Sequence, residues 1–355
     1  MSEKVLIKGN EAIGAAAILA GCRYYFGYPI TPQSELPEYM AKKLPPIGGV
    51  FLQAESEIAA INMLYGAAAS GARAMTSSSS PGFSLKQEGI SYIAAAELPC
   101  LLVNVQRGGP GLGTIQPGQA DYFQATKGGG HGDYRLLVLA PNSVQELFDL
   151  TFEGFDLADK YRIPVLILAD GAIGQTMEAV NMDVKSPQLV EKPWATTGRH
   201  GRKETNVVKT LYFDSEEAEQ ANRDLQTKYA LITNNERRCE EFFTQDADLV
   251  LVAYGISARI AKSAVKKLRE QGLKVGLLRP ITLWPFPAPD LLRVAQTAKS
   301  FLVVELSTGQ MIEDVELAIR CQKPVHFYGR TGGNIPSTEE IVQQALKIMN
   351  DKGEN

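Results

Sequence analysis

The chain has 355 residues, of which 45% are hydrophobic and 21% are charged, and its formal net charge is −4. This length predicts two or three domains, and the composition is that of a globular protein with ample apolar residues for a core. The mild negative charge and the lack of a long apolar run give no reason to expect nucleic acid or a membrane as a partner. The N-terminal residues lack a signal-peptide pattern, so a cytoplasmic location is expected.

Residues 1–185 alternate short apolar runs with helical patterns, beginning with an alanine-rich helix over Asn10–Ala20 that ends at Gly21. Five later apolar runs are expected as strands: 50–52, 74–76, 100–105, 136–139 and 164–168. Ser143 and Glu146 form a capping-box pattern before a further helix. Strands alternating with helices predict a mostly parallel sheet.

The pattern changes after residue 185. A polar stretch and a charged helical segment over 186–246 predict a linker and a helical excursion, with a solvated surface favoured over contact with a partner. From Asp248 strand-like and helix-like segments alternate again, and Ser337 opens a last helix. The expected fold class is therefore α/β, with two doubly wound, mostly parallel-sheet domains at 1–185 and 247–355.

The four cysteines are far apart in the sequence, at Cys22, Cys100, Cys239 and Cys321. No Cys-x-x-Cys pair is available for zinc or an iron–sulfur cluster, and the three histidines are scattered. We therefore expect no metal site on this chain. If the protein takes part in electron transfer, its clusters should lie on another chain.

The sequence Tyr-Pro-Ile-Thr-Pro at 28–32 follows an expected strand. Each proline fixes its own φ and favours an extended residue before it, so Thr31 presents its hydroxyl at the carboxyl end of that strand. Ligands bind at this end of the strands in open α/β sheets. The alternative is a rigid strand-to-helix turn without a ligand.

With the preceding glycine, this segment resembles the signature of the α subunit of thiamine-diphosphate-dependent 2-oxoacid:ferredoxin oxidoreductases. The resemblance covers nearly the whole chain and is closest to the type that acts on branched-chain 2-oxoacids such as 2-ketoisovalerate. It implies a thiamine pyrimidine-binding-like domain followed by a transketolase C-terminal-like domain. It also implies that Pro29 and Ile30 lie against the cofactor and that Thr31 binds substrate.

Glu57 opens a helix of small and apolar residues directly after an expected strand. In the pyrimidine-binding domains of thiamine enzymes, a glutamate at this place contacts N1′ of the aminopyrimidine, and a glycine follows nine positions later. Glu57 and Gly66 stand in that relation and Glu55 does not, so the resemblance assigns Glu57 to catalysis and cofactor binding. The alternative is a carboxylate that only stabilises the helix N-terminus.

A loop of small residues, Thr-Ser-Ser-Ser-Ser-Pro-Gly at 76–82, lets the backbone approach a ligand closely. It resembles the Ser-Gly-Pro-Gly loop of thiamine enzymes, with Ser80 in place of the first glycine. The resemblance assigns Ser79, Ser80 and Pro81 to cofactor binding. A plain helix N-cap is an equally good interpretation of the residues alone.

Arg107 ends an expected strand, and Gly-Gly-Pro-Gly follows at 108–111. A guanidinium fork with room beside it suits an anion such as a 2-oxoacid carboxylate, with the Thr31 hydroxyl as second donor. The alternative is a surface salt bridge. The resemblance also places the loop of His131 near the substrate, although a histidine without an acid–base role is the simpler interpretation of its residues.

Asp170 and Gly171 lack the other residues of a magnesium–diphosphate motif, so no diphosphate site is expected here. The glycine turns at 255–257 and 329–334 are nonspecific candidates for anion binding.

The resemblance implies thiamine diphosphate shared with a β subunit that supplies the diphosphate and magnesium side. It further implies a γ subunit and a small ferredoxin-like subunit with [4Fe-4S] clusters.

The activity implied is the CoA-dependent oxidative decarboxylation of a branched-chain 2-oxoacid to an acyl-CoA, with reduction of ferredoxin. A 2-oxoglutarate enzyme is the first alternative. Two other classes stay open, a non-redox thiamine-dependent enzyme and a non-catalytic scaffold subunit.

Overall fold

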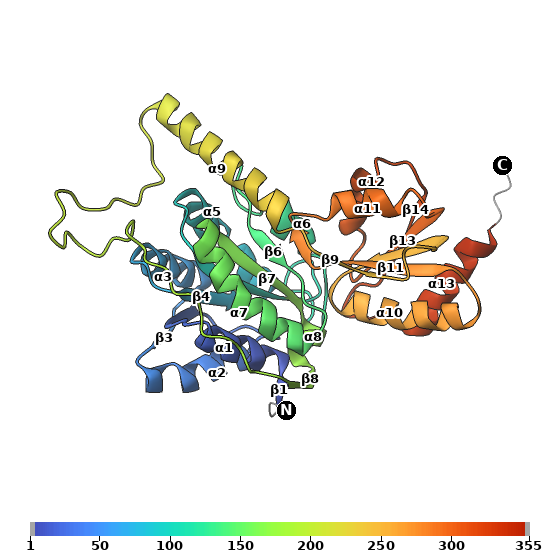
Figure 1. Ribbon diagram of the computed structural model, residues 1–355. Helices are drawn as coiled ribbons and strands as arrows, with labels where there is room; N and C mark the ends of the chain where they lie inside the picture. Colours follow the sequence, from blue (N-terminus) through green and yellow to red (C-terminus); the bar gives the residue numbers. More distant parts are fainter. Residues whose placement is uncertain (1–3, 352–355) are drawn as a thin grey trace.

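The computed structural model describes residues 4–351 and contains two α/β units, joined by a long excursion and a helix (Figure 1). The first unit is built on a seven-stranded sheet of order β12-β6-β7-β5-β4-β2-β3. Its strands are β2 (Tyr24–Gly27), β3 (Val50–Gln53), β4 (Ala74–Ser78), β5 (Cys100–Gln106), β6 (Leu137–Leu139), β7 (Pro164–Asp170) and β12 (Thr282–Trp284). All neighbours are parallel except β12, which pairs antiparallel with β6.

Helices cover both faces of this sheet, as a parallel sheet requires. They are α1 (Gly9–Leu19), α2 (Glu35–Lys43), α3 (Glu57–Ala69), α4 (Ser80–Ser84), α5 (Gln87–Ala95), α6 (Tyr122–Thr126), α7 (Val144–Tyr161) and α8 (Gly171–Gln175), with a 3-10 turn at Pro45–Ile47. Alternate residues of β5 enter two cores: Leu101 and Val103 pack with α1 and α7, while Leu102 packs with α3 and α5. A separate pair, β1 (Val5–Lys8) and β8 (Met177–Val180), is antiparallel.

The second unit has a five-stranded sheet of order β14-β13-β10-β11-β9. Its strands are β9 (Cys239–Phe242), β10 (Leu249–Ala253), β11 (Val275–Pro280), β13 (Ser300–Glu305) and β14 (Val325–Gly329), and only β9 is antiparallel. The helices α10 (Gly255–Glu270) and α13 (Thr338–Asn350) pack on one face, and α11 (Ala288–Val294) and α12 (Met311–Ala318) pack on the other. Ser337 begins the last helix, as expected, and forms a capping box with Glu340.

The segment between the units differs in part from the expected linker over 186–246. Residues 181–214 contain no helix or strand. The segment first packs on the first unit, where Ala195 is buried and Thr196 bonds the carbonyl of Ala69, and the loop that follows extends away from it (Figure 1). The charged stretch then forms a single helix, α9 (Ser215–Asn235), held to the first core by Leu225, Tyr229 and Ile232. The last residues of the expected linker belong to the second unit, because β9 pairs with β11 in the second sheet.

Asp170 joins the two units through one buried carboxylate. Its Oδ1 accepts hydrogen bonds from the N–H groups of Ala172 (3.1 Å) and Ile173 (3.0 Å) and so caps α8. Its Oδ2 accepts from the N–H of Ile256 (2.8 Å), at the start of α10 in the second unit. Burial raises the pKa of Asp170 to about 6, against the lowering effect of these donors. The turn at 255–257, a candidate anion loop in the sequence, is therefore a contact between units.

Gln119 forms the second buried link. Its Oε1 accepts hydrogen bonds from Ser257 Oγ (2.8 Å) and from the N–H of Leu306 (3.0 Å), and its Nε2 donates to the Tyr254 carbonyl (2.9 Å). One amide thus connects the first unit to β13 and α10 of the second. Among residues 4–351, no helix is long and apolar enough to cross a membrane.

Candidate active site

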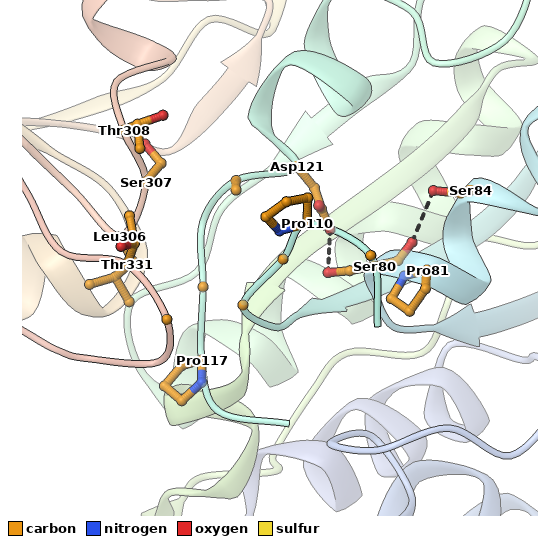
Figure 2. Close-up of a pocket in the computed structure, with 16 residues that line it drawn as sticks. Ser80, Pro81, Ser84, Pro110, Pro117, Asp121, Leu306, Ser307, Thr308 and Thr331 are labelled. Atoms are coloured by element: carbon orange, nitrogen blue, oxygen red, sulfur yellow. Dashed lines mark hydrogen bonds between the residues drawn. The ribbon is translucent and has the colours of Figure 1, made fainter. Parts of the chain in front are cut away.

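A cavity of about 580 Å³ lies where the loops of the two units meet (Figure 2). The first unit contributes Ser80, Pro81 and the glycine loop 108–111, which follow β4 and β5. The second unit contributes residues 306–308 and 331–332, which follow β13 and β14. The cavity therefore lies at the carboxyl ends of parallel strands from both sheets, the edge at which such sheets bind ligands.

Ser80 fixes the wall of this cavity on the side of the first unit (Figure 2). Its Oγ donates to Asp121 Oδ2 (2.6 Å) and accepts from the N–H of Arg107 (3.0 Å), and its own N–H donates to Asn104 Oδ1 (3.1 Å). Burial raises the pKa of the Asp121 carboxyl, while the donors Ser80 and Asn104 lower it. Asn104 and Asp121 are not among the residues predicted from the sequence, although an asparagine inside the apolar strand β5 is unusual.

Glu57 is the first residue of α3, where Ser56 caps the helix by accepting a backbone hydrogen bond (3.2 Å). The Glu57 residue is 6% exposed, whereas Glu55 is exposed to solvent. No residue of the described range, 4–351, gives the Glu57 carboxylate a hydrogen bond or an ion pair. A Cβ atom at Gly82 would overlap both Glu57 Oε1 and Ser78 Oγ. The glycine therefore allows the turn of α4 to lie directly against the carboxylate.

These residues fit the pyrimidine side of thiamine diphosphate. A buried carboxylate without a partner can hold a proton at a ring nitrogen, and the glycine leaves room for close packing. The hydroxyls of Ser78 and Ser79 are also buried without a hydrogen-bond partner in the described part of the chain, so both can still bond a ligand. Asp170 is not available for a diphosphate-bound cation, because backbone N–H groups use both of its oxygens.

Arg107 is a buried cation at the end of β5, 8% exposed. Its Nη1 donates to the Thr31 carbonyl (3.0 Å) and its Nη2 to the Leu112 carbonyl (2.9 Å), while Nε has no partner. No carboxylate of residues 4–351 forms an ion pair with it. A buried charge without a counter-charge is unfavourable, so this arrangement favours an anionic ligand. Arg107 therefore lies against the backbone of Thr31, whereas the pairing expected from the sequence involves the Thr31 hydroxyl and stays a prediction.

Of the residues that the resemblance assigns to cofactor or substrate, Ser80 and Pro81 line the first cavity, whereas Glu57, Ser79 and Arg107 lie behind its lining. Thr31 lines a second cavity of about 430 Å³, which shares Pro117 with the first one. Pro29 lines a third cavity of about 290 Å³ beside α2, and Ile30 lines none of these three.

His131 lies away from Thr31 and Arg107. Its exposed ring stands edge-on to Tyr92, with 5.9 Å between the ring centroids, and its carbonyl accepts a hydrogen bond from Ser91 Oγ (2.7 Å). It lines none of the cavities described above.

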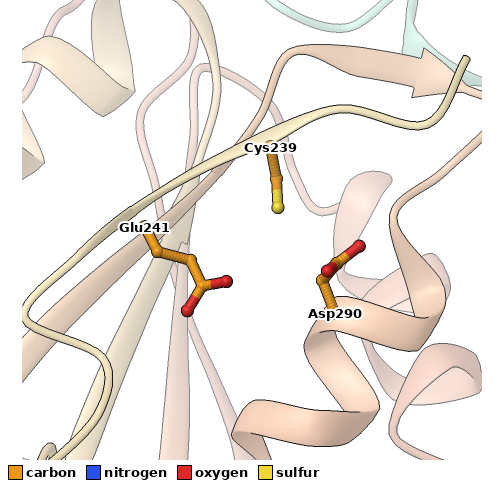
Figure 3. Close-up of side chains that lie close together, drawn as sticks. All are labelled: Cys239, Glu241 and Asp290. Atoms are coloured by element: carbon orange, nitrogen blue, oxygen red, sulfur yellow. The ribbon is translucent and has the colours of Figure 1, made fainter.

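A cluster of possible metal ligands lies at the edge of the second sheet (Figure 3). One ligand atom each of Cys239, Glu241 and Asp290 lies within 4.8 Å of the others. Arg293 already pairs with Glu241, and its Nη2 lies 3.6 Å from Asp290 Oδ1. Burial, with a contribution from both carboxylates, raises the pKa of the Cys239 thiol to about 12. The arginine already pairs with Glu241 and lies beside Asp290, so we assign no metal to the cluster.

Comparison with known proteins gives the class of the protein. Residues 15–237 match the family described as pyruvate flavodoxin/ferredoxin oxidoreductase, thiamine diphosphate-binding, and residues 247–341 match pyruvate:ferredoxin oxidoreductase core domain II. The chain belongs to the 2-oxoacid:ferredoxin oxidoreductase family, which confirms the resemblance seen in the sequence. Its first matched segment is the thiamine diphosphate-binding domain of that family.

Two relatives align along their whole length. The chain is 51% identical to ketoisovalerate oxidoreductase subunit VorB of Methanothermobacter marburgensis, over 98% of this chain and 99% of that one. It is 36% identical to 2-oxoglutarate synthase subunit KorA of Methanothermobacter thermautotrophicus, over 98% and 100% of the two chains.

A solved structure confirms the predicted α/β fold class. The 2-oxoglutarate:ferredoxin oxidoreductase from Magnetococcus marinus superposes with a TM-score of 0.84 at 29% identity. The match covers 98% of this chain and 65% of that one, so this chain spans somewhat less than two thirds of the other's length.

Proposed function

We propose that this chain is the pyrimidine-side subunit of a complex that oxidises a branched-chain 2-oxoacid, 2-ketoisovalerate, to its acyl-CoA and reduces ferredoxin. The observation that carries the proposal is the buried carboxylate of Glu57, which has no partner in the described range and lies against Gly82. The 51% identity to a ketoisovalerate oxidoreductase subunit supports the choice of substrate. 2-Oxoglutarate is the second candidate, because relatives with that name are 36% identical.

Thiamine diphosphate would supply the stabilisation of the carbanion that decarboxylation of a 2-oxoacid requires. Glu57 would hold a proton at N1′ of its aminopyrimidine, and Ser78 and Ser79 would donate or accept the bonds that they do not make within the chain. Ser80 and Pro81, whose turn forms one cavity wall, would keep water from the reacting centre.

Arg107 and Thr31 would hold the carboxylate of the substrate. The guanidinium is fixed by two backbone carbonyls, so it is oriented before the substrate binds, and Nε remains as a free donor. Fixing the charge in advance lowers the entropic penalty of placing the substrate. The Thr31 hydroxyl would add a second donor on the other side of Pro117.

We further propose that partner chains complete the cofactor site and the electron path. A β subunit would supply the diphosphate and magnesium side, a small ferredoxin-like subunit the [4Fe-4S] clusters, and a γ subunit would complete the complex, which uses CoA and works in the cytoplasm. The relatives are named as subunits, which supports a multi-chain enzyme. Cys22 and Cys100 are buried, and burial raises the pKa of both thiols, which disfavours the thiolate form that cluster ligands need.

The test is Glu57→Gln in the assembled complex, with Glu55→Gln as the matched control. The amide cannot hold the proton at N1′, and loss of one specific electrostatic contact lowers turnover by about 10²–10³-fold. Glu55, which is exposed, should be replaceable without loss. Turnover of Glu57→Gln close to that of the wild type would refute the cofactor role. Relative kcat/KM for 2-ketoisovalerate and 2-oxoglutarate in the wild type decides between the two substrates.

A further inference from the structure

The last part of the long excursion, residues 206–213, resembles a β-strand that has no neighbour. Its sequence, Asn-Val-Val-Lys-Thr-Leu-Tyr-Phe, is rich in the β-branched and aromatic residues that favour strands. Along it, half-buried residues at even positions alternate with exposed residues at odd positions, which is the two-residue period of a strand. Yet the segment lies in the projecting loop before α9 and belongs to none of the sheets of the described residues (Figure 1).

The backbone of this segment is unpaired. Within residues 4–351, no backbone N–H or carbonyl group of 206–213 forms a hydrogen bond. Backbone polar groups of a strand are normally bonded to a neighbouring strand, and a free strand edge can add to a strand of another chain. The segment therefore offers a complete set of donors and acceptors for strand pairing.

Both ends of the segment are fixed to the rest of the chain. Asn206 Nδ2 donates to the carbonyls of Pro193 and Ala195, the latter at 2.8 Å, and Ala195 is buried. At the other end Asp214 caps α9. A segment that is already held extended loses less conformational entropy when it binds.

The outward side chains of the segment are mostly apolar. Val207 is 75% exposed, Leu211 is 65% exposed and Phe213 is 96% exposed. Lys209, the remaining outward residue, forms an ion pair with Glu217 of α9. Apolar side chains gathered on one exposed face mark a contact with another protein.

We propose that residues 206–213 pair with the same segment of a second copy of this chain, as an antiparallel ribbon whose two-fold axis passes through Thr210. In this register the sequence is complementary to itself. Val207 lies opposite Phe213 on the outer face, and Val208 lies opposite Tyr212 on the inner face. Pairs of a β-branched and an aromatic residue stabilise antiparallel strands, and the two-fold axis makes each pair occur twice.

The neighbouring registers are less favourable. A shift of two residues in one direction places Lys209 opposite Lys209, and like charges directly opposite each other destabilise a strand pair. A shift in the other direction places Val208 opposite the Asp214 that caps α9. The register centred on Thr210 avoids both contacts, which favours a second copy of the chain over an unrelated strand as the partner.

The first experiment is disulfide trapping in the full chain, with the exposed Cys321 replaced by serine. Thr210 is the residue that lies opposite itself, and opposite Cα atoms in antiparallel strands are about 4.5–5.5 Å apart, within the range of a disulfide. Mild oxidation should therefore convert most of Thr210→Cys into a covalent dimer of the chain.

Glu204→Cys is the matched control for this trap, because Glu204 is exposed in the same loop but does not lie opposite itself. It should form about tenfold less covalent dimer. A Thr210→Cys chain that stays monomeric after oxidation would overturn the proposal. So would a disulfide that forms, in the assembled complex, to a different subunit in place of the second copy.

The second experiment measures the dimer dissociation constant of the full chain by sedimentation equilibrium. Phe213→Ser should raise this constant about tenfold, because the pair with Val207 is lost twice about the axis. Leu317→Ser is the control, since Leu317 is a comparably exposed apolar residue (68%) on α12 and should leave the constant unchanged. Equal constants in the two variants, or a wild-type chain that stays monomeric at every concentration, would overturn the proposal. Neither experiment depends on the role of Glu57.

Discussion

The guanidinium of Arg107 is hydrogen-bonded to the backbone of Thr31, with 3.0 Å between Nη1 and the carbonyl oxygen. The bond links the ends of β5 and β2, which are separated in the sheet by β4. The arginine is therefore held in place by the segment that carries the other proposed carboxylate donor. A substitution at either residue should therefore shift the position of the other.

The first prediction concerns this pair in the assembled complex. Arg107→Lys keeps the charge but loses the planar fork that bonds both carbonyls, so kcat/KM for the 2-oxoacid should fall strongly. Thr31→Val removes one donor of similar shape and should cost about 1–3 kcal/mol in transition-state binding. A double-mutant cycle on kcat/KM should show coupling, because the two residues share one ligand group.

Two results would contradict this assignment. Strict additivity would mean that the residues act independently. A KM that stays at the wild-type value in Arg107→Ala would mean that the arginine only shapes the loop.

The second prediction concerns the glycine at the carboxylate. In Gly82→Ala the new methyl group would overlap Glu57 Oε1 and Ser78 Oγ, so the turn or the carboxylate has to move. We expect weaker thiamine diphosphate binding and a fall in turnover of at least tenfold, since small displacements at a reacting centre have large effects on rate. Calorimetric titration of the complex with the cofactor measures the first effect directly.

Gly66→Ala is the comparison for this change, at the second glycine, the one that the resemblance relates to Glu57. Gly66 is exposed in this structure. Gly66 lies within α3, and no atom of the described residues approaches its Cβ position within 4 Å. Alanine is favoured over glycine inside a helix, so the free chain should gain about 1 kcal/mol in stability. If Gly82→Ala binds the cofactor as well as Gly66→Ala does, the close contact with Glu57 has no functional importance.

The third prediction concerns pH and the link between the two units. The folded state raises the pKa of Asp170 from 3.8 to about 6, so it binds a proton where the unfolded chain does not. Stability from this group therefore increases as pH falls from about 6 toward 3.8, and it is lost as pH rises through 6. Asp170→Asn should remove this dependence and, by losing hydrogen bonds at the helix starts, lower the free energy of unfolding by about 1–3 kcal/mol.

Denaturant unfolding of both proteins at about pH 4.5, 6 and 7.5 checks the predicted pH dependence of stability. The difference between wild type and Asp170→Asn should grow as the pH is lowered. A difference that is the same at all three values would show that the buried carboxyl does not titrate in this range.

Much of the fold is predictable because its signals are local. The helix expected over Asn10–Ala20 is found at Gly9–Leu19. Gly21 follows with a φ of 85°, which glycine adopts easily because it has no Cβ atom. The strand expected over 100–105 is found at Cys100–Gln106, because an apolar run suits a strand that is buried on both faces. The placement of β9 and β12 was not predictable, since an edge strand is defined by its neighbour and not by its own residues.

The site divides in the same way. Glu57, Ser80 and Arg107 were identified because each stands in a short motif at a strand or helix end. Asn104 and Asp121 did not stand out in the sequence, because the hydrogen bonds that place them at the cavity come from residues on other strands and helices. A cytoplasmic location and all the residue-level roles, those of Glu57, Thr31 and Arg107 as much as those of Pro29, Ile30 and His131, stay predictions.

Because of the short strand β12, the chain cannot be cut between its two units without removing a strand from the first sheet. It belongs by sequence to the second unit, yet it covers the outer edge of β6 in the first sheet. A fragment that stops near residue 246 would leave β6, whose three residues are buried and apolar, as an unpaired edge open to self-association. The two halves should therefore aggregate when they are expressed separately. In a chimaera of two relatives, residues 282–284 should come from the same relative as the first half.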